Sequence, residues 1–249
     1  MPELDLFQAA TWPDGLREVL DELRPIFRSW ELGLPDRSAP TFDAAIRTLG
    51  QALMPHTLRG YHFTRLTEGE ADQIRANGLK VLSIELLDRR IATLVAQGAL
   101  THAQAQRLLV HNQVRDSNRA GKAWFCFYPA HEVSENGVRS LLGHWGGEAL
   151  YNFNAEDPEL GPALRSLGSP ALVEADVPVA FLSTTTKLSF AVSRLDLVHQ
   201  GIMSGEYRDR FEDYSTKTVE ASMVRRVVLH PGNEFLELTL CQQWQELLA

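Results

Sequence analysis

The sequence has few cysteines, a deficit of positive charge and no long apolar run. Its two cysteines, Cys126 and Cys241, are too few for a disulfide framework or a cysteine-based zinc site, which favours a reducing compartment. The 24 Lys and Arg residues are outnumbered by 32 Asp and Glu residues, and the net charge of −8 excludes a chain that binds nucleic acid over its whole surface. No apolar stretch approaches the ~18 residues of a membrane span. We therefore expect a soluble, cytoplasmic protein without a membrane partner.

Several catalytic motifs are also missing. Neither a GxxxxGK[ST] loop nor a GxGxxG turn after a strand occurs, which excludes the P-loop and Rossmann nucleotide sites. His131-Glu132 begins an HExxH pattern, but the fifth residue is Glu135, so the two-histidine zinc helix is lost and we predict no metal site. The GxSxG turn of the acyl-transfer hydrolases does not occur either.

The remaining pattern predicts an α+β fold. Residues 1–58 carry two segments with apolar side chains at helical spacing, and we expect this helical region to pack on a domain formed by residues 59–249. Short β-prone segments recur along that domain, at 123–129, 171–182, 218–230 and 233–241. Because helices and strands do not alternate regularly, doubly wound and barrel folds are excluded.

The segment 59–79 is the most informative part of the chain. It begins with a short alternating strand, and the spacing of Thr67 and Glu70 is that of a capping box, which predicts a helix start. Gly78 directly follows Asn77 at the position where a glycine ends a helix. The segment therefore predicts a strand, a turn, a short capped helix and a new strand.

Residues 83–120 predict an inserted helical hairpin, with Thr101 as the N-cap of its second helix. Between residues 80 and 122 seven Lys and Arg residues face three acids, a balance of 7 − 3 = +4 in a chain of −8. Two interpretations stay open: a solvated helical face, or a basic cover, including Arg89 and Arg90, for a phosphate-bearing ligand.

Residues 61–64 (Tyr-His-Phe-Thr) and 74–79 (Ile-Arg-Ala-Asn-Gly-Leu), joined by the capped helix, resemble the opening motif of the ADP-ribosyltransferase superfamily. The resemblance is to the diphtheria-toxin and poly-ADP-ribose polymerase branch, and it covers roughly residues 59–240. It implies a split β-sheet core, to which the N-terminal helical region and the hairpin are additions. It also implies NAD as the substrate and no metal.

The same resemblance implies roles for individual residues. A carboxylate would stabilise the oxocarbenium-like state formed when the glycosidic bond of NAD breaks, and Glu220 matches the family's position on a late strand. An aromatic ring would stack on the nicotinamide. The implied catalytic residues are Glu220, His62 and Tyr128, and the implied cofactor-binding residues are His62, Thr64, Arg65, Tyr128 and Gly78.

Alternatives remain for two of these roles. Phe125 or Phe127 could stack in place of Tyr128, because the strand register is not fixed by the sequence. Glu148, in a Gly-Gly segment rich in aromatic residues, competes with Glu220 for the catalytic role. The loop before Glu220 carries polar residues of the kind that this family uses for target recognition: Glu206, Glu212 and Tyr214.

The function expected from the resemblance is mono-ADP-ribosylation of an intracellular macromolecule, protein or nucleic acid, by a toxin or effector. In a toxin-antitoxin system a neutralising antitoxin would be a further partner. The Ser-Thr-Ser triplet and the Glu-x-Glu motif of arginine-specific members are missing, which argues against arginine as the acceptor. The alternatives are an NAD-dependent RNA 2′-phosphotransferase and a non-catalytic domain that binds a nucleotide or a protein.

Overall fold

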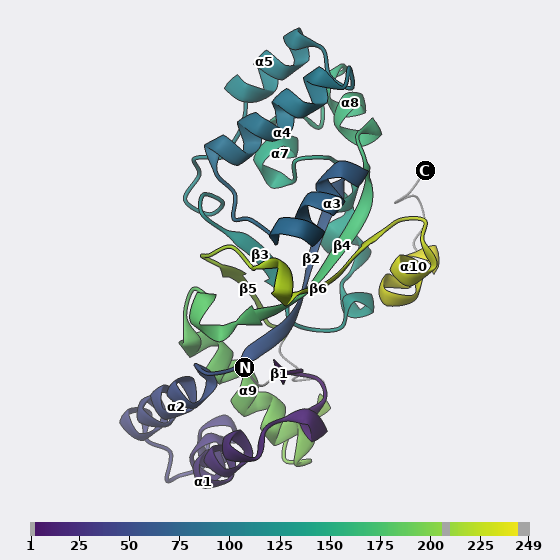
Figure 1. Cartoon of the computed structure of the whole chain (residues 1–249). Coiled ribbons are helices and arrows are strands. Elements are labelled where there is room, and N and C mark those ends of the chain that lie inside the picture. Colours follow the sequence, from purple (N-terminus) through teal and green to yellow (C-terminus); the bar gives the residue numbers. More distant parts are fainter. Residues whose placement is uncertain (1–2, 206–209, 244–249) are drawn as a thin grey trace. The chain divides into compact units, whose positions relative to one another are not determined.

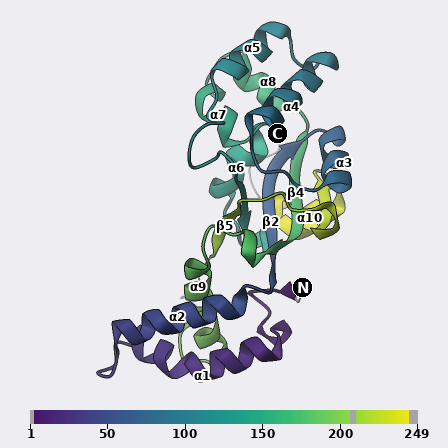
Figure 2. The same cartoon turned by 60° about the vertical axis from the view of Figure 1, so that its left-hand side comes forward.

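The computed structural model describes residues 3–205 and 210–243, and its contacts divide the chain into two compact units (Figures 1 and 2). The first unit contains Met1–Gly60, Cys126–Tyr128 and Asp176–Tyr214. The second contains Tyr61–Phe125, Pro129–Ala175 and Ser215–Ala249. Helices and a largely antiparallel sheet occur together, which confirms the predicted α+β class.

The sheet has six strands in the described part of the chain, in the order β5-β3-β2-β4-β6, with β1 paired to β2. β1 runs parallel to β2 with Glu3 opposite Thr57, and β6 runs antiparallel to β4 with Val173 opposite Val227. The strands are β1 (Glu3–Leu4), β2 (Thr57–Leu66), β3 (Ala123–Cys126), β4 (Ser169–Pro178), β5 (Glu212–Ser215) and β6 (Val224–Leu229). Since the side chains of β4 are buried at eight of its ten positions, it reads as a strand covered on both faces.

Three helices form the body of the first unit: α1 (Asp14–Glu31), α2 (Ala39–Leu53) and α9 (Thr185–His199). The two helices predicted within residues 1–58 are confirmed, and both pack against α9. α1 continues through Pro25, because the fully buried Phe27 extends its apolar face beyond that residue. Residues 176–214, which include α9, also belong to this unit. The predicted domain boundary between residues 58 and 59 stays a prediction.

The second unit holds the predicted capped helix and the hairpin. Thr67 and Glu70 form the expected capping box at the start of α3 (Glu68–Asn77), and Thr101 forms another at the start of α5. The hairpin consists of α4 (Ile84–Ala96) and α5 (His102–Val110), and its side chains share an apolar core with Trp145 and with α8. Figure 1 shows α4, α5 and α8 near one another. The unit's other helices are α6 (Glu135–Gly143), α7 (Glu148–Asn154), α8 (Leu160–Ser166) and α10 (Asn233–Thr239).

Two strand predictions near the C-terminus are wrong. Most of the segment 233–241 is the helix α10 (Asn233–Thr239), because Phe235 and Thr239 are the buried positions and their spacing of four fits one helical face. The strand predicted over 218–230 begins only at Val224. Before it, Val219 pairs with Leu79 in an isolated bridge and the chain makes a 3-10 turn.

Gly78 shows why this position requires glycine. Its φ is +78°, and a Cβ built there would lie 2.1 Å from the carbonyl oxygen of Val219. The close approach lets the backbone of Leu79 exchange two hydrogen bonds with Val219, at 2.8 and 2.9 Å. Gly78 thus joins the end of α3 to the segment that precedes β6.

We predict that Gly78→Ala lowers the free energy of unfolding by about 3 kcal/mol, because it adds a steric overlap to an unfavourable φ. Gly98 is the matched control: its φ is +72°, but a Cβ there would meet nothing within 4 Å. Gly98→Ala should cost only about 1 kcal/mol. Equal losses in denaturant unfolding of the two variants would contradict the steric explanation.

Candidate functional site

His62 is held in one tautomer by the neighbouring strand. Its Nδ1 lies 2.8 Å from the backbone carbonyl oxygen of Trp124, so Nδ1 carries the proton and donates, while Nε2 keeps a lone pair. Burial lowers the pKa of His62, and the charge of Arg90 lowers it further. The imidazole is therefore neutral at pH 7 and presents Nε2 as an acceptor.

The alternation of β2 separates the predicted site residues. His62 and Thr64 lie two positions apart and share one face of the strand, whereas Arg65 belongs to the opposite face. Arg65 donates from Nε to the carbonyl oxygen of Leu167 at 2.8 Å and from Nη1 to that of Leu142 at 3.1 Å. Two of its donors thus hold the C-terminal ends of α8 and α6, and its role at a pyrophosphate stays a prediction.

Glu70 is the centre of a partly buried polar cluster in the second unit. Besides capping α3, its carboxylate accepts hydrogen bonds from Arg90 Nε at 2.5 Å and from Trp145 Nε1 at 2.9 Å. Burial alone would raise the pKa of Glu70, but the charge of Arg90 and the hydrogen bonds from Arg90, Thr67 and Trp145 outweigh it, and the pKa lies below its ordinary value. Glu70 therefore stays ionised.

Arg90 lies flat over an aromatic ring and keeps one unsatisfied donor. Its guanidinium carbon is 4.6 Å from the centre of the fully buried Trp145 ring, a cation–π contact. Nη2 of Arg90 is buried and has no hydrogen-bond partner. The neighbouring Arg89 is exposed instead. The two arginines that were expected to act together are therefore in different environments.

Three of the seven cationic residues of the hairpin segment form salt bridges within its own unit. Arg90 meets Glu70, and Arg107 bonds to Asp157 and, at 2.7 Å, to Glu159. In the loop after α5, Arg119 pairs with Glu148 at 3.0 Å and with Asp116 at 3.1 Å. These pairs attach the hairpin segment to α3, α7 and the start of α8, which neither of the two sequence interpretations anticipated.

Tyr128 belongs to the first unit and is buried, with 4 % of its surface exposed. Its hydroxyl donates to Glu212 at 2.5 Å, and the Cys126 sulfur lies 3.8 Å from the same carboxylate. Burial and Glu212 raise the pKa of Tyr128, and they raise that of Cys126 to about 12. Both groups are therefore protonated at neutral pH and neither is a nucleophile.

Sequence reasoning placed Glu212 in a loop and missed this arrangement. The residue opens β5, the strand beside β3 in the sheet order. Residues 211–215 alternate between buried and accessible positions, but Asp213 and Ser215 are among the buried ones, so the sequence carried no apolar alternation that could have predicted the strand. Glu220, by contrast, is exposed and precedes the 3-10 turn, and Glu148 is exposed and paired with Arg119.

The aromatic residues of 124–128 differ sharply in exposure. Phe125, Phe127 and Tyr128 are buried, whereas Trp124 is 45 % exposed. Phe125 instead packs near the His62 ring, with the ring centres 5.8 Å apart. The aromatic side chain with an accessible surface is thus one that the sequence analysis did not consider.

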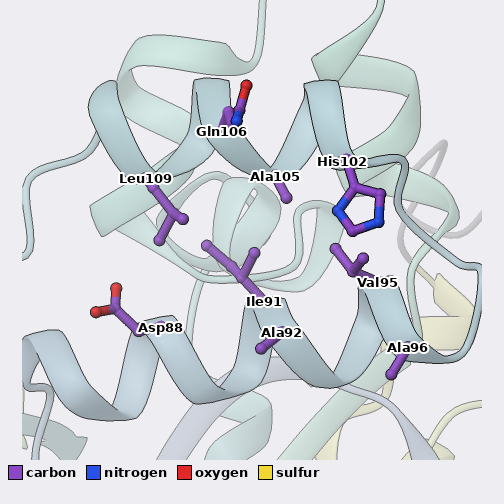
Figure 3. A pocket seen from close by; sticks show the side chains of 9 residues that line it. All are labelled: Asp88, Ile91, Ala92, Val95, Ala96, His102, Ala105, Gln106 and Leu109. Carbon is purple, nitrogen blue, oxygen red and sulfur yellow. The ribbon is translucent and has the colours of Figure 1, made fainter.

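A cavity of about 480 Å³ lies between α4 and α5 (Figure 3). Ile91 and Val95 of α4 and Ala105 of α5 give it apolar walls, while Asp88 and His102 lie toward its two ends. Nothing in it resembles a catalytic constellation. It is a groove of the hairpin surface.

Comparisons with known proteins leave the site to be judged from its own geometry. No protein-family model, curated protein or solved structure matches the chain. Among the described residues no group of three or more His, Cys, Asp or Glu could hold a metal ion. None of the helices in the described ranges has the length and apolar character needed to cross a membrane.

We predict that Glu70→Gln lowers the free energy of unfolding by about 2 kcal/mol at pH 7, because it removes the charge that faces Arg90. The lowered pKa means that this stabilisation is fully present above the unfolded value of about 4.3 and is lost as the pH falls through the folded value. Glu68→Gln, at the exposed start of α3, should cost less than about 0.5 kcal/mol. A difference from wild type that persists unchanged at pH 3 would contradict the assignment.

Proposed function

We propose that this protein is an NAD-dependent mono-ADP-ribosyltransferase that modifies an intracellular macromolecule, as a toxin or effector, on a split β-sheet core. The observation that carries the proposal is the state of His62: a neutral histidine on β2, with Nδ1 bonded to the neighbouring strand, Nε2 acceptor-only and Thr64 on the same face. His-x-Thr on such a strand is what the sequence resemblance requires.

The chemistry of NAD explains why a neutral histidine suits this position. The nicotinamide ring carries a positive charge, and breaking its glycosidic bond moves that charge toward the ribose. A protonated imidazole would repel it, whereas a neutral one accepts a hydrogen bond from a ribose hydroxyl or the nicotinamide amide through Nε2. The lowered pKa of His62 therefore supports the binding role.

We keep Glu220 as the proposed catalytic carboxylate. It belongs to the same unit as His62, is exposed, and directly follows Val219, whose backbone pairs with Leu79 at the end of α3. Tyr128 is buried in the other unit and hydrogen-bonded to Glu212, which does not favour a role as the stacking aromatic.

Incubation of the protein with labelled NAD and a cell lysate tests the reaction class. Label transferred to protein or nucleic acid supports the transferase. Release of a cyclic phosphate product from 2′-phosphorylated RNA would identify the phosphotransferase instead. If NAD is neither cleaved nor transferred under any condition, the chain is a binding domain without catalysis.

We predict that His62→Ala weakens NAD binding about tenfold in calorimetric titration, because the acceptor Nε2 is lost. His102→Ala is the control, since His102 is exposed on α5 in the same unit. Its affinity should match that of the wild type. NAD binding that survives His62→Ala unchanged would show that the site is elsewhere.

The isosteric change Glu220→Gln should reduce nicotinamide release from NAD by at least ~10²-fold while NAD still binds, because only the charge that stabilises the oxocarbenium is removed. Glu148→Gln is the matched control, since Glu148 is also exposed in the second unit, and it should stay within about threefold of wild type. Loss of activity in Glu148→Gln with an active Glu220→Gln would show that Glu148 is the catalytic acid instead.

A further inference from the structure

Trp124 is the exposed aromatic residue of β3, and its side chain is fixed. The indole Nε1 donates to the backbone carbonyl oxygen of Asn118 at 3.1 Å. Its own backbone carbonyl accepts the hydrogen bond from His62. Trp124 is 45 % exposed, and because neighbouring side chains alternate along a strand, its ring lies on the face of β3 opposite Phe125, whose ring packs near His62.

The loop that holds the indole is itself well anchored. Within residues 111–122, Asp116 accepts backbone hydrogen bonds from Asn118, Arg119 and Ala120 at 2.8 to 2.9 Å. Arg119 pairs with Glu148, and Val114 is buried in the core shared by the hairpin and α8. The ring of Trp124 is therefore presented with little conformational freedom, so a ligand that stacks on it loses little entropy.

Cationic residues lie in the loop that holds the indole and in the segment that is hydrogen-bonded to this loop. Leu82 exchanges backbone hydrogen bonds with the loop, donating to Lys122 at 3.1 Å and accepting from Gly121 at 2.8 Å, which brings the segment carrying Lys80 alongside the residues before Trp124. Lys80 is exposed, as is Arg115 in the loop. Unlike Arg119, neither Lys80 nor Arg115 forms a described salt bridge in this unit.

We propose that Trp124 is a stacking platform for a nucleobase, and that the acceptor of the transferase is single-stranded nucleic acid whose phosphates meet Lys80, Arg115 and Lys122. A flat aromatic face with cationic residues in the adjoining segments suits a chain of alternating bases and phosphates. Only a local patch is needed, so the net charge of −8 does not oppose it. The role of the nucleic acid as acceptor rests on the proposed function, whereas the binding of nucleic acid to Trp124 does not.

The direct test is fluorescence anisotropy of labelled single-stranded DNA and RNA oligonucleotides of mixed sequence, without NAD, at low and moderate salt. Trp124→Ala should weaken binding at least about tenfold, and Trp124→Phe, which keeps a stacking ring, should stay within about threefold. Phe153→Ala is the matched control, because Phe153 is 61 % exposed in the same unit. The double change of Lys80 and Arg115 to Ala should reduce the salt dependence of binding.

The outcomes separate this inference from the proposed function. Cleavage of NAD without any oligonucleotide binding, or binding that is unaffected by Trp124→Ala, would overturn the platform while leaving the transferase in place. Oligonucleotide binding without NAD cleavage would overturn the transferase alone. NAD affinity should be the same in Trp124→Ala and wild type, since a parallel loss would mean that the ring stacks on NAD. Transfer of label to protein only would also overturn the nucleic-acid acceptor.

Discussion

The carboxylate of Glu70 is the constraint on which the second unit depends. One side chain caps α3, receives Arg90 from α4 and receives the indole N–H of Trp145. Three separate segments are thereby fixed to one partly buried charge, and Trp145 is also part of the hairpin's apolar core. Removing a carboxylate from water costs free energy unless it is hydrogen-bonded, and here Arg90, Trp145 and the N-cap Thr67 donate to it.

The salt bridges of the hairpin segment give part of its positive charge a structural role. A surplus of +4 in a chain of −8 suggested a cover for a phosphate-bearing ligand. In the structure Arg90, Arg107 and Arg119 are used to attach the hairpin segment to acidic partners in the same unit. Of the remaining cations, Arg89 is exposed on α4, whereas Lys80 and Arg115 are exposed in the two segments that adjoin Trp124, where we propose the phosphate contacts.

The sequence was most informative for features that depend on contacts between residues close together in the chain. The capping box of Thr67 and Glu70 and the glycine end of α3 involve neighbours within a few residues, so spacing was sufficient. The position of Glu212 was missed because it depends on which distant segment pairs with β3, and the burial of Tyr128 depends on strand register. Residues 233–241 were misassigned since Leu and Phe suit a strand, while the four-residue spacing of buried positions that makes α10 appears only in the packed chain.

The central claim is that His62 is a neutral acceptor at an NAD site, and nitrogen NMR of its imidazole tests this most directly. The signals are assigned by their loss in a His62 variant. We expect a protonated Nδ1 and an unprotonated Nε2 at pH 7, and a shift of the Nε2 signal when NAD is added. A protonated Nε2, or a signal that does not move at saturating NAD, would contradict it.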